Sequence, residues 1–366
     1  MMKKQLFKLF LFTVLLVLGN SGIIYAYNDA LQPLVSPELL KAGKLQMLWQ
    51  NKLPMQENES IEKLYILDNR IYALSSQNYL VSLNRETGEV IFSRPLVKAG
   101  LPVVGFNLYK EEIFSIAGNK LIQINTEFGS DLSVKGLKFG AACPAARNNS
   151  FFYIASTDTL MHILRADDKV RTSKISAQNN SVITSILADE KFVIFATSAG
   201  NCIRITTDAS NRLWQFDAAD SIVEPIVRDG NFLYFASSDT NLYKLNLLNG
   251  KLVWKYQTGA ELKKSPTVTE NLVYQYVSDK GLLAINKKTG QFEWRLAEGL
   301  DLLTETNGKA YVITNRPTLT VMSNEKNMKM YSVNFADTSR YAVNTVDSKI
   351  YIAAKDGRIS CINPIE

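Results

Sequence analysis

One pattern recurs along most of this sequence at a spacing of about forty residues. Each copy has an apolar segment centred on an aromatic or aliphatic residue, then a short polar turn and a second strand-like segment. The eight centres are Tyr72, Phe114, Tyr153, Ile194, Tyr234, Tyr274, Tyr311 and Tyr351. Successive centres lie 37 to 42 residues apart. This regularity predicts an array in which each copy is one unit that packs on its neighbours.

Each copy carries signals for more than one hairpin. In the copy around Tyr274, the turn 278–281 supplies Asp and Gly, which tolerate left-handed backbone angles. In the preceding copy, Asn249 and Gly250 close a further hairpin ahead of a segment with alternating apolar positions at 252–256. One copy therefore predicts about four short antiparallel strands.

Four-stranded units repeated eight times predict an all-β fold, an eight-bladed β-propeller of four-stranded antiparallel blades. A ring of small sheets packed face to face buries apolar faces that one sheet alone would expose. The copy around Tyr351 ends without a fourth strand, whereas Trp49 stands in a strand-like segment before the first complete copy. We therefore expect residues 45–53 to complete the eighth blade and close the ring, so that the propeller occupies residues 45–366.

The first 26 residues have the features of a secretory signal peptide. Lys3, Lys4 and Lys8 precede a short apolar run at 9–18, and Ala26 stands at a cleavage point. The apolar run is too short to span a bilayer. Because the first cysteine is Cys143, we expect a soluble periplasmic protein without a lipid anchor. Residues 27–44 form an N-terminal extension, with a short helix predicted to begin at 36–38.

Charge and cysteine content exclude several classes of function. Half of the net charge of +6 comes from the three lysines of the signal peptide, and the remaining paired lysines, at 263–264 and 287–288, are isolated. Nucleic acid is therefore not an expected partner. Cys143, Cys202 and Cys361 are odd in number and far apart, so we expect small buried hydrophobes and no structural disulfide.

No catalytic, cofactor or metal site stands out among the titratable residues. His162 is the only histidine and is interpreted as a strand-surface residue. A solvated loop is expected at 56–62, which contains three glutamates. Four aspartates recur at equivalent turns and could bind a cation, but turn chemistry already explains them. They are Asp158, Asp239, Asp279 and Asp356.

The segment 284–294 reads Ala-Ile-Asn-Lys-Lys-Thr-Gly-Gln-Phe-Glu-Trp and resembles the tryptophan-docking repeat of the PQQ-like β-propeller family. Weaker copies occupy 244–254 and 82–92, and Leu132 and Val170 are expected at the tryptophan position of the second and third copies. In that family the tryptophan is a wedge between neighbouring blades. The resemblance therefore implies a structural docking role for a set of tryptophans and motif glycines, namely Trp49, Trp214, Trp254, Trp294, Gly250 and Gly290.

Within that family the chain is most similar to the propeller subunit of the bacterial outer-membrane β-barrel assembly machine. The resemblance implies a monomeric, non-enzymatic envelope scaffold whose partner is another protein, such as an assembly component. The alternative is a propeller that binds a small molecule or the quinone PQQ, including a dehydrogenase. Those enzymes carry a calcium-binding carboxylate set and often an adjacent cysteine pair, neither of which can be placed here. We therefore expect no cofactor, and the sequence assigns no residues to partner binding.

Overall fold

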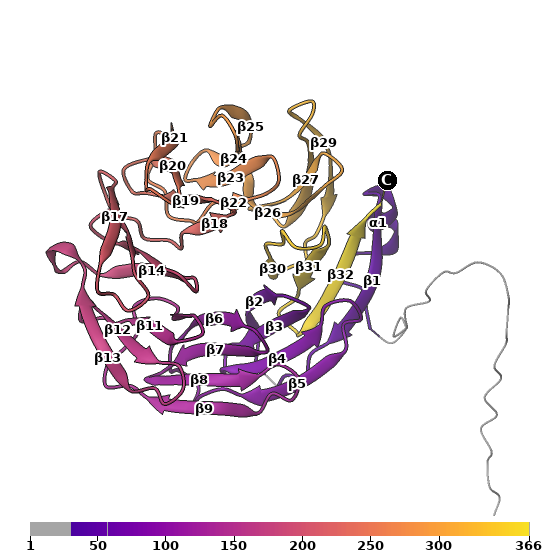
Figure 1. The fold of residues 1–366 in the computed structure, drawn as a ribbon. Coiled ribbons are helices and arrows are strands. Elements are labelled where there is room, and N and C mark those ends of the chain that lie inside the picture. The colour runs from indigo at the N-terminus through magenta and orange to yellow at the C-terminus, as the bar shows by residue number, and fades with distance from the viewer. Residues whose placement is uncertain (1–30, 57, 366) are drawn as a thin grey trace, which may run out of the picture.

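The computed structural model describes residues 31–56 and 58–365, and the predicted signal peptide, residues 1–26, lies outside them. Within the described residues, thirty-two strands form eight four-stranded antiparallel sheets. Figure 1 shows these sheets arranged as blades in a ring. The predicted fold class, an eight-bladed propeller, is confirmed.

Blades 1 to 4 each use four strands that are consecutive in the chain, here called strands A to D from the inside of the ring outward. Blade 1 is β2 (Ile61–Leu67), β3 (Arg70–Ser75), β4 (Tyr79–Asn84) and β5 (Val90–Pro95). Blade 2 is β6 (Val103–Tyr109), β7 (Glu112–Ala117), β8 (Lys120–Asn125) and β9 (Asp131–Gly136). Blade 3 is β10 (Ala146–Arg147), β11 (Phe151–Ala155), β12 (Leu160–Arg165) and β13 (Arg171–Ser176). Blade 4, which follows the 3-10 turn Gln178–Asn180, is β14 (Ile183–Ala188), β15 (Val193–Thr197), β16 (Asn201–Ile205) and β17 (Arg212–Asp217).

Blades 5 to 7 repeat this order, and blade 8 combines the two ends of the chain. Blade 5 is β18 (Val227–Asp229), β19 (Phe232–Ala236), β20 (Asn241–Asn246) and β21 (Leu252–Gln257). Blade 6 is β22 (Thr267–Val268), β23 (Leu272–Val277), β24 (Gly281–Asn286) and β25 (Phe292–Leu296). Blade 7 is β26 (Gly299–Thr306), β27 (Lys309–Thr314), β28 (Thr318–Ser323) and β29 (Met328–Asn334). Blade 8 is β30 (Arg340–Ala342), β31 (Ile350–Ala353), β32 (Arg358–Pro364) and β1 (Leu45–Lys52).

The ring closes as the sequence predicts. β1 pairs antiparallel with β32 as the outermost strand of blade 8, and Trp49 lies opposite Cys361. A short helix, α1 (Pro37–Ala42), precedes β1 and packs against both β1 and β29 of blade 7. The Ser36 side chain caps it by accepting from Leu39 N, 3.4 Å away. The hydroxyl of Tyr331 donates to the carbonyl of Gly43, 2.9 Å away, so the helix region links blades 7 and 8.

The core lies between the blades. All eight repeat centres fall on strand B of a blade and are at most 1 % exposed, because each faces the neighbouring sheet. Cys143, Cys202 and Cys361 are free and buried, as expected for small hydrophobes. Burial raises the pKa of the Cys143 thiol to about 12. The repeat pattern thus identified the centre of the core.

Two interpretations of single residues were wrong. His162 is not on the surface but 3 % exposed, because the loop before blade 3 covers it and the Phe139 ring stacks on it with centroids 3.8 Å apart. Glu59 is not solvated but buried at 9 % exposure. Its carboxylate accepts hydrogen bonds from the Ser75 hydroxyl and from Gln56 N, which draws it into the blade.

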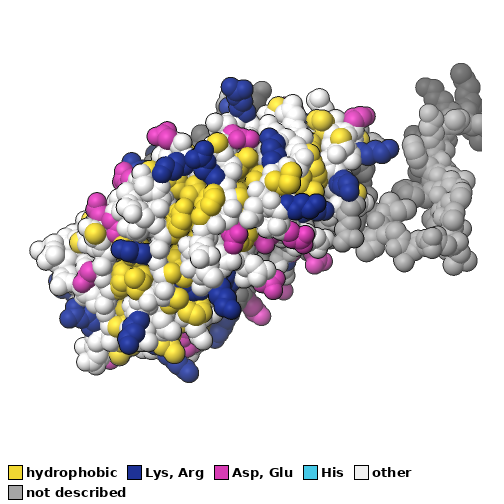
Figure 2. Space-filling model, turned by 90° about the horizontal axis from the view of Figure 1, so that it is seen from above, with side chains coloured by type: hydrophobic (Ala, Val, Ile, Leu, Met, Phe, Trp, Pro, Cys, Tyr) yellow, Lys and Arg dark blue, Asp and Glu magenta, His cyan; other side chains and the backbone are white. Residues whose placement is uncertain are grey.

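The outer rim is amphipathic. Figure 2 shows hydrophobic side chains gathered between basic and acidic ones on one side of the molecule. Several exposed hydrophobics, including Leu252, Phe292 and Met330, lie on D strands. Within residues 31–56 and 58–365, no helix is long and apolar enough to cross a membrane.

Candidate functional site

Tryptophans on strand D contact the next blade around the ring. The indole nitrogens of Trp49, Trp214 and Trp254 each donate to a backbone carbonyl in the turn between strands C and D of that blade, all at 3.1 Å. Trp294 instead donates to the Asn324 side chain, 3.0 Å away. These contacts fit the docking role that the family resemblance implies, which we carry forward as a proposal to be tested by substitution.

At several of these seams, a glycine in the C–D turn of the next blade packs against the indole. A Cβ added at Gly250 would lie 2.6 Å from Trp214, and one added at Gly290 would lie 2.7 Å from Trp254. Both glycines also have positive φ, +69° and +73°. A side chain at either position would collide with the ring, so the two motif residues depend on each other.

Blades 2 and 3 lack the tryptophan. Each D strand carries a bulge, and the residue paired like Trp254 is Ser133 in blade 2 and Ser173 in blade 3. The expectation that Leu132 and Val170 occupy this position was wrong, because it selected an apolar residue. The bulge is the same in blades 1 to 7, and the position lies four residues after Gly129 in blade 2 and after Lys169 in blade 3, as Trp254 follows Gly250. Both side chains are about half exposed.

An arginine occupies the seam between blades 2 and 3. The Arg147 guanidinium stacks over the rings of Tyr109 and Phe152, 4.3 and 4.7 Å from their centroids. It also forms an ion pair with Glu112 of blade 2. Stacking and charge thus join these two blades at their inner strands, and similar cation contacts occur in blades 4 and 5, where Arg204 lies over Phe192 and Lys244 over Phe232.

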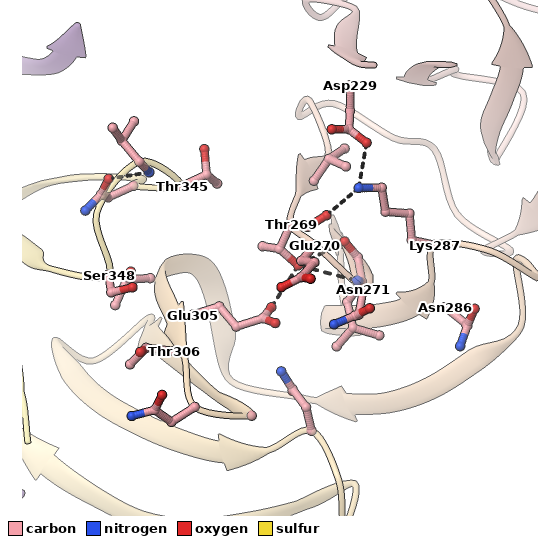
Figure 3. A pocket seen from close by; sticks show the side chains of 18 of the residues that line it. Asp229, Thr269, Glu270, Asn271, Asn286, Lys287, Glu305, Thr306, Thr345 and Ser348 are labelled. Atoms are coloured by element: carbon pink, nitrogen blue, oxygen red, sulfur yellow. Dashed lines mark hydrogen bonds and ion pairs between the residues drawn. The ribbon is translucent and has the colours of Figure 1, made fainter. Parts of the chain in front are cut away.

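A cavity of about 1020 Å³ opens at the end of the ring where strands A and B connect. Its wall comes from the A–B connections of four successive blades, 5 to 8, and from the C–D turns of blades 6 and 7. Figure 3 shows Asp229, Thr269, Glu305 and Thr345 projecting from these different blades around one space. We take this cavity as the candidate functional site.

On the opposite side of the ring mouth, side chains of blades 2 and 4 meet: the Tyr109 hydroxyl of blade 2 donates to Glu190 of blade 4, 2.7 Å away. In blade 8 the inner strand β30 has only three residues, which leaves 343–349 as a loop on the cavity wall. This site could not be predicted from the sequence, because its residues come from the A–B connections of four blades and the C–D turns of two, with no shared motif.

Lys287 joins the cavity wall to a blade seam. Its ammonium lies 2.5 Å from Asp229 Oδ2 and donates to the Thr269 carbonyl, 2.8 Å away (Figure 3). Its backbone carbonyl accepts from the Trp254 indole and from Lys244 Nζ. The Lys287 ammonium is therefore fixed in the cavity wall by Asp229 and Thr269.

Glu305 is oriented by a second network. Tyr274 and Thr269 donate hydroxyl hydrogen bonds to Glu305 Oε2, at 2.6 and 2.8 Å. Burial, with the charge of Glu305, raises the pKa of Tyr274 well above its ordinary value. The phenol therefore stays protonated and donates to the carboxylate. Asn324 donates to the same phenol oxygen, which connects the site to Trp294.

The cavity wall is acidic. Five carboxylates line it against two cationic side chains, Arg228 and Lys287. Both cations are already paired, Arg228 with Asp189 and Lys287 with Asp229. Among the described residues, the other four carboxylates of the wall form no ion pair, and they are Glu270, Glu293, Glu305 and Glu325.

The turn aspartates lie at the other end of the blades. Asp158, Asp239, Asp279 and Asp356 fall in B–C turns, which necessarily face away from the A–B turns. Asp239 Oδ1 accepts from Asn241 N at 2.9 Å, and Asp356 Oδ1 accepts from Arg358 N at 3.1 Å, both as turn contacts. In the part of the chain that the structure describes, no group of three His, Cys, Asp or Glu is placed to hold a metal ion.

Comparison with known proteins finds one family model that matches part of the chain and solved structures with a similar fold. A PQQ-like family model, described as outer membrane protein assembly factor BamB, matches residues 207–364. The structure of BamB from Moraxella catarrhalis is similar at a TM-score of 0.67 and 15% identity, over 87% of this chain and 99% of that one. The computationally designed protein Ika8 is similar at 0.66 and 13%, over 86% of this chain and 99% of the design. No curated protein matches the sequence.

Proposed function

We propose, from the premise that this chain is a PQQ-like β-propeller similar to BamB, that it is a non-catalytic scaffold of the bacterial envelope. In this function it binds another protein during outer-membrane protein assembly. We further propose that it acts as a monomer in the periplasm and associates with the outer membrane through that partner.

One observation carries this proposal: the described ring accounts for 99% of the BamB structure it resembles. A second supports it, since the family model that matches residues 207–364 bears the same description. At 15% identity the likeness concerns the fold, and function resides in sites placed on a fold. The binding surface must therefore be found on this chain itself.

The test is an in-cell crosslinking pull-down of the tagged mature protein from envelope membranes, followed by mass spectrometry. We expect reproducible capture of a component of the outer-membrane barrel assembly machinery. Capture of no such component in a clean experiment would overturn the proposal. The purified protein titrated with PQQ and calcium provides the second arm, because a saturable absorbance change would favour the quinone-binding alternative instead.

A further inference from the structure

We propose that the acidic cavity of blades 5 to 8 binds a lysine- or arginine-bearing segment of the partner protein. This inference rests on the proposed scaffold function and assigns it a site. The site belongs to the A–B end of the ring, so it also identifies the face of the propeller that the partner approaches.

The size of the cavity fits a polypeptide segment. Its volume, about 1020 Å³, lies at the upper end of the roughly 300 to 1,000 Å³ typical of pockets for single small molecules. Four blades contribute to it, so a ligand that fills it touches several turns at once. A short stretch of chain with two or more long side chains meets these dimensions.

The distribution of charge favours an extended cationic ligand. The four carboxylates without an ion pair are spread over two blades, Glu270 and Glu293 on blade 6 and Glu305 and Glu325 on blade 7. Successive basic side chains of one segment can each meet a different carboxylate. Such pairing also gives long-range attraction, because fields from like charges add at the mouth of a cavity.

Two uncharged features of the wall also suit a polypeptide. Thr304 is 1 % exposed, and its hydroxyl has no hydrogen-bond partner among the described residues, although the residue lines the cavity. A buried hydroxyl without a partner is costly, so this part of the wall has a polar group that the protein itself leaves unsatisfied. At the rim, Val346 is 56 % exposed and offers apolar contact beside the charges.

The first experiment measures binding of a fluorescein-labelled dodecapeptide of alternating lysine and serine to the mature protein by fluorescence anisotropy. A matched peptide with glutamate in place of lysine is the control ligand. We expect saturable binding of the lysine peptide only. Binding should weaken several-fold between about 50 mM and about 300 mM salt, because screening shortens the reach of each charge. Absence of binding, or equal binding of both peptides, overturns the proposal.

Matched variants locate the binding. Glu270→Gln with Glu325→Gln removes two exposed carboxylates of the cavity and should weaken the lysine peptide about tenfold. Glu86→Gln with Glu127→Gln removes the same charge from C–D turns at the same end of the ring, outside the cavity, and should change affinity less than about twofold. Equal weakening in both variants would mean non-specific attraction and would overturn the proposal.

Photo-crosslinking in cells connects the cavity with the partner. With p-benzoylphenylalanine in place of Val346, we expect a crosslink to a lysine- or arginine-rich segment of the partner, and none from the exposed control position Phe128. A crosslink to an acidic or wholly apolar segment overturns the cavity proposal. If the pull-down still captures the partner with Glu270→Gln and Glu325→Gln in place, the scaffold function stands and the cavity assignment fails. If the wild type captures none, the function itself fails.

Discussion

The seams of blades 4 to 6 and those of blades 2 and 3 solve the same packing problem with different side chains. Trp214, Trp254 and Trp294 contact the next blade through an indole. At the equivalent positions of blades 2 and 3 the chain has serines, and the seam between these two blades has Arg147 of the innermost strand stacked between rings. The family model matches only 207–364, the part with these three tryptophans. The family model therefore matches where the tryptophan motif is kept. The propeller itself also forms where other side chains fill the space between blades.

The residue in the C–D turn of the next blade, which faces the docking side chain, differs between these seams. Where the docking residue is Trp214 or Trp254, the facing turn has a glycine. Where it is Ser173, the corresponding turn of blade 4 carries Ala209, also at positive φ (+59°). A Cβ is nevertheless tolerated beside one tryptophan, because the turn that faces Trp294 has Asn327 at the position of Gly290, also at positive φ (+52°).

The largest expected effect is the loss of a tryptophan. Trp294 is 2 % exposed and packs near the Tyr274 ring, with centroids 5.7 Å apart. We expect Trp294→Ala to lower the free energy of unfolding by about 3 to 5 kcal/mol, since it leaves a cavity in the seam. Ser173→Ala, at the equivalent position of blade 3, should change it by less than about 0.5 kcal/mol. Urea unfolding measures both, and a loss under about 1 kcal/mol for Trp294→Ala would place the indole outside the stabilising core.

The second effect concerns the C–D turn that faces the Trp254 indole. Gly290→Ala should cost about 2 to 4 kcal/mol, because its Cβ would meet Trp254 and its φ is positive. Ala209→Gly relieves the same backbone conformation without a facing indole and should remain within about 1 kcal/mol of the wild type. Thermal unfolding of the two variants compares them directly. Equal destabilisation would show that Gly290 is needed only for the positive φ of its turn and not for the contact with Trp254.

The third prediction tests the arginine contact between blades 2 and 3. Arg147→Ala removes two ring contacts and the ion pair with Glu112, so we expect a loss of about 1 to 3 kcal/mol in chemical denaturation. Arg147→Lys keeps the charge but not the flat stacking group, and most of the loss should persist. Full stability of the lysine variant would assign the contact to charge alone.

The smallest effect is a dependence on pH in the same region. Burial lowers the pKa of His162 below its ordinary value near 6.5, so the unfolded chain binds its proton more readily than the folded one. Stability should therefore be complete above about pH 6.5 and fall as the pH drops toward the folded pKa. Urea unfolding at pH 7.5 and 5.5 measures the change, and His162→Gln should reduce it. An equal loss of stability between pH 7.5 and 5.5 in the His162→Gln variant would assign the pH dependence to carboxylates instead of His162.

The blades were predictable from the sequence because one strand-B centre recurs every forty residues and is buried by the same contact each time. The closing strand was predictable because the copy around Tyr351 lacked a fourth strand while Trp49 had no copy of its own. The docking positions Ser133 and Ser173 were missed because a serine there does not continue the pattern of bulky residues, although the spacing from the preceding turn is the same as in blade 5. The cavity was not predictable, because Glu270, Glu305 and Val346 meet only once the ring has formed.

Ring closure also sets an order of events in time. β1 is made among the first elements of the propeller, yet its partner β32 is made last, and Trp49 meets Cys361 only when nearly the whole chain is present. Contacts so distant in sequence form slowly, because the loop between them must first be closed. Until then blade 8 has only three of its strands and β32 presents an unpaired edge. A chain that stops before Arg358 would leave β1 without its partner, so the ring would stay open.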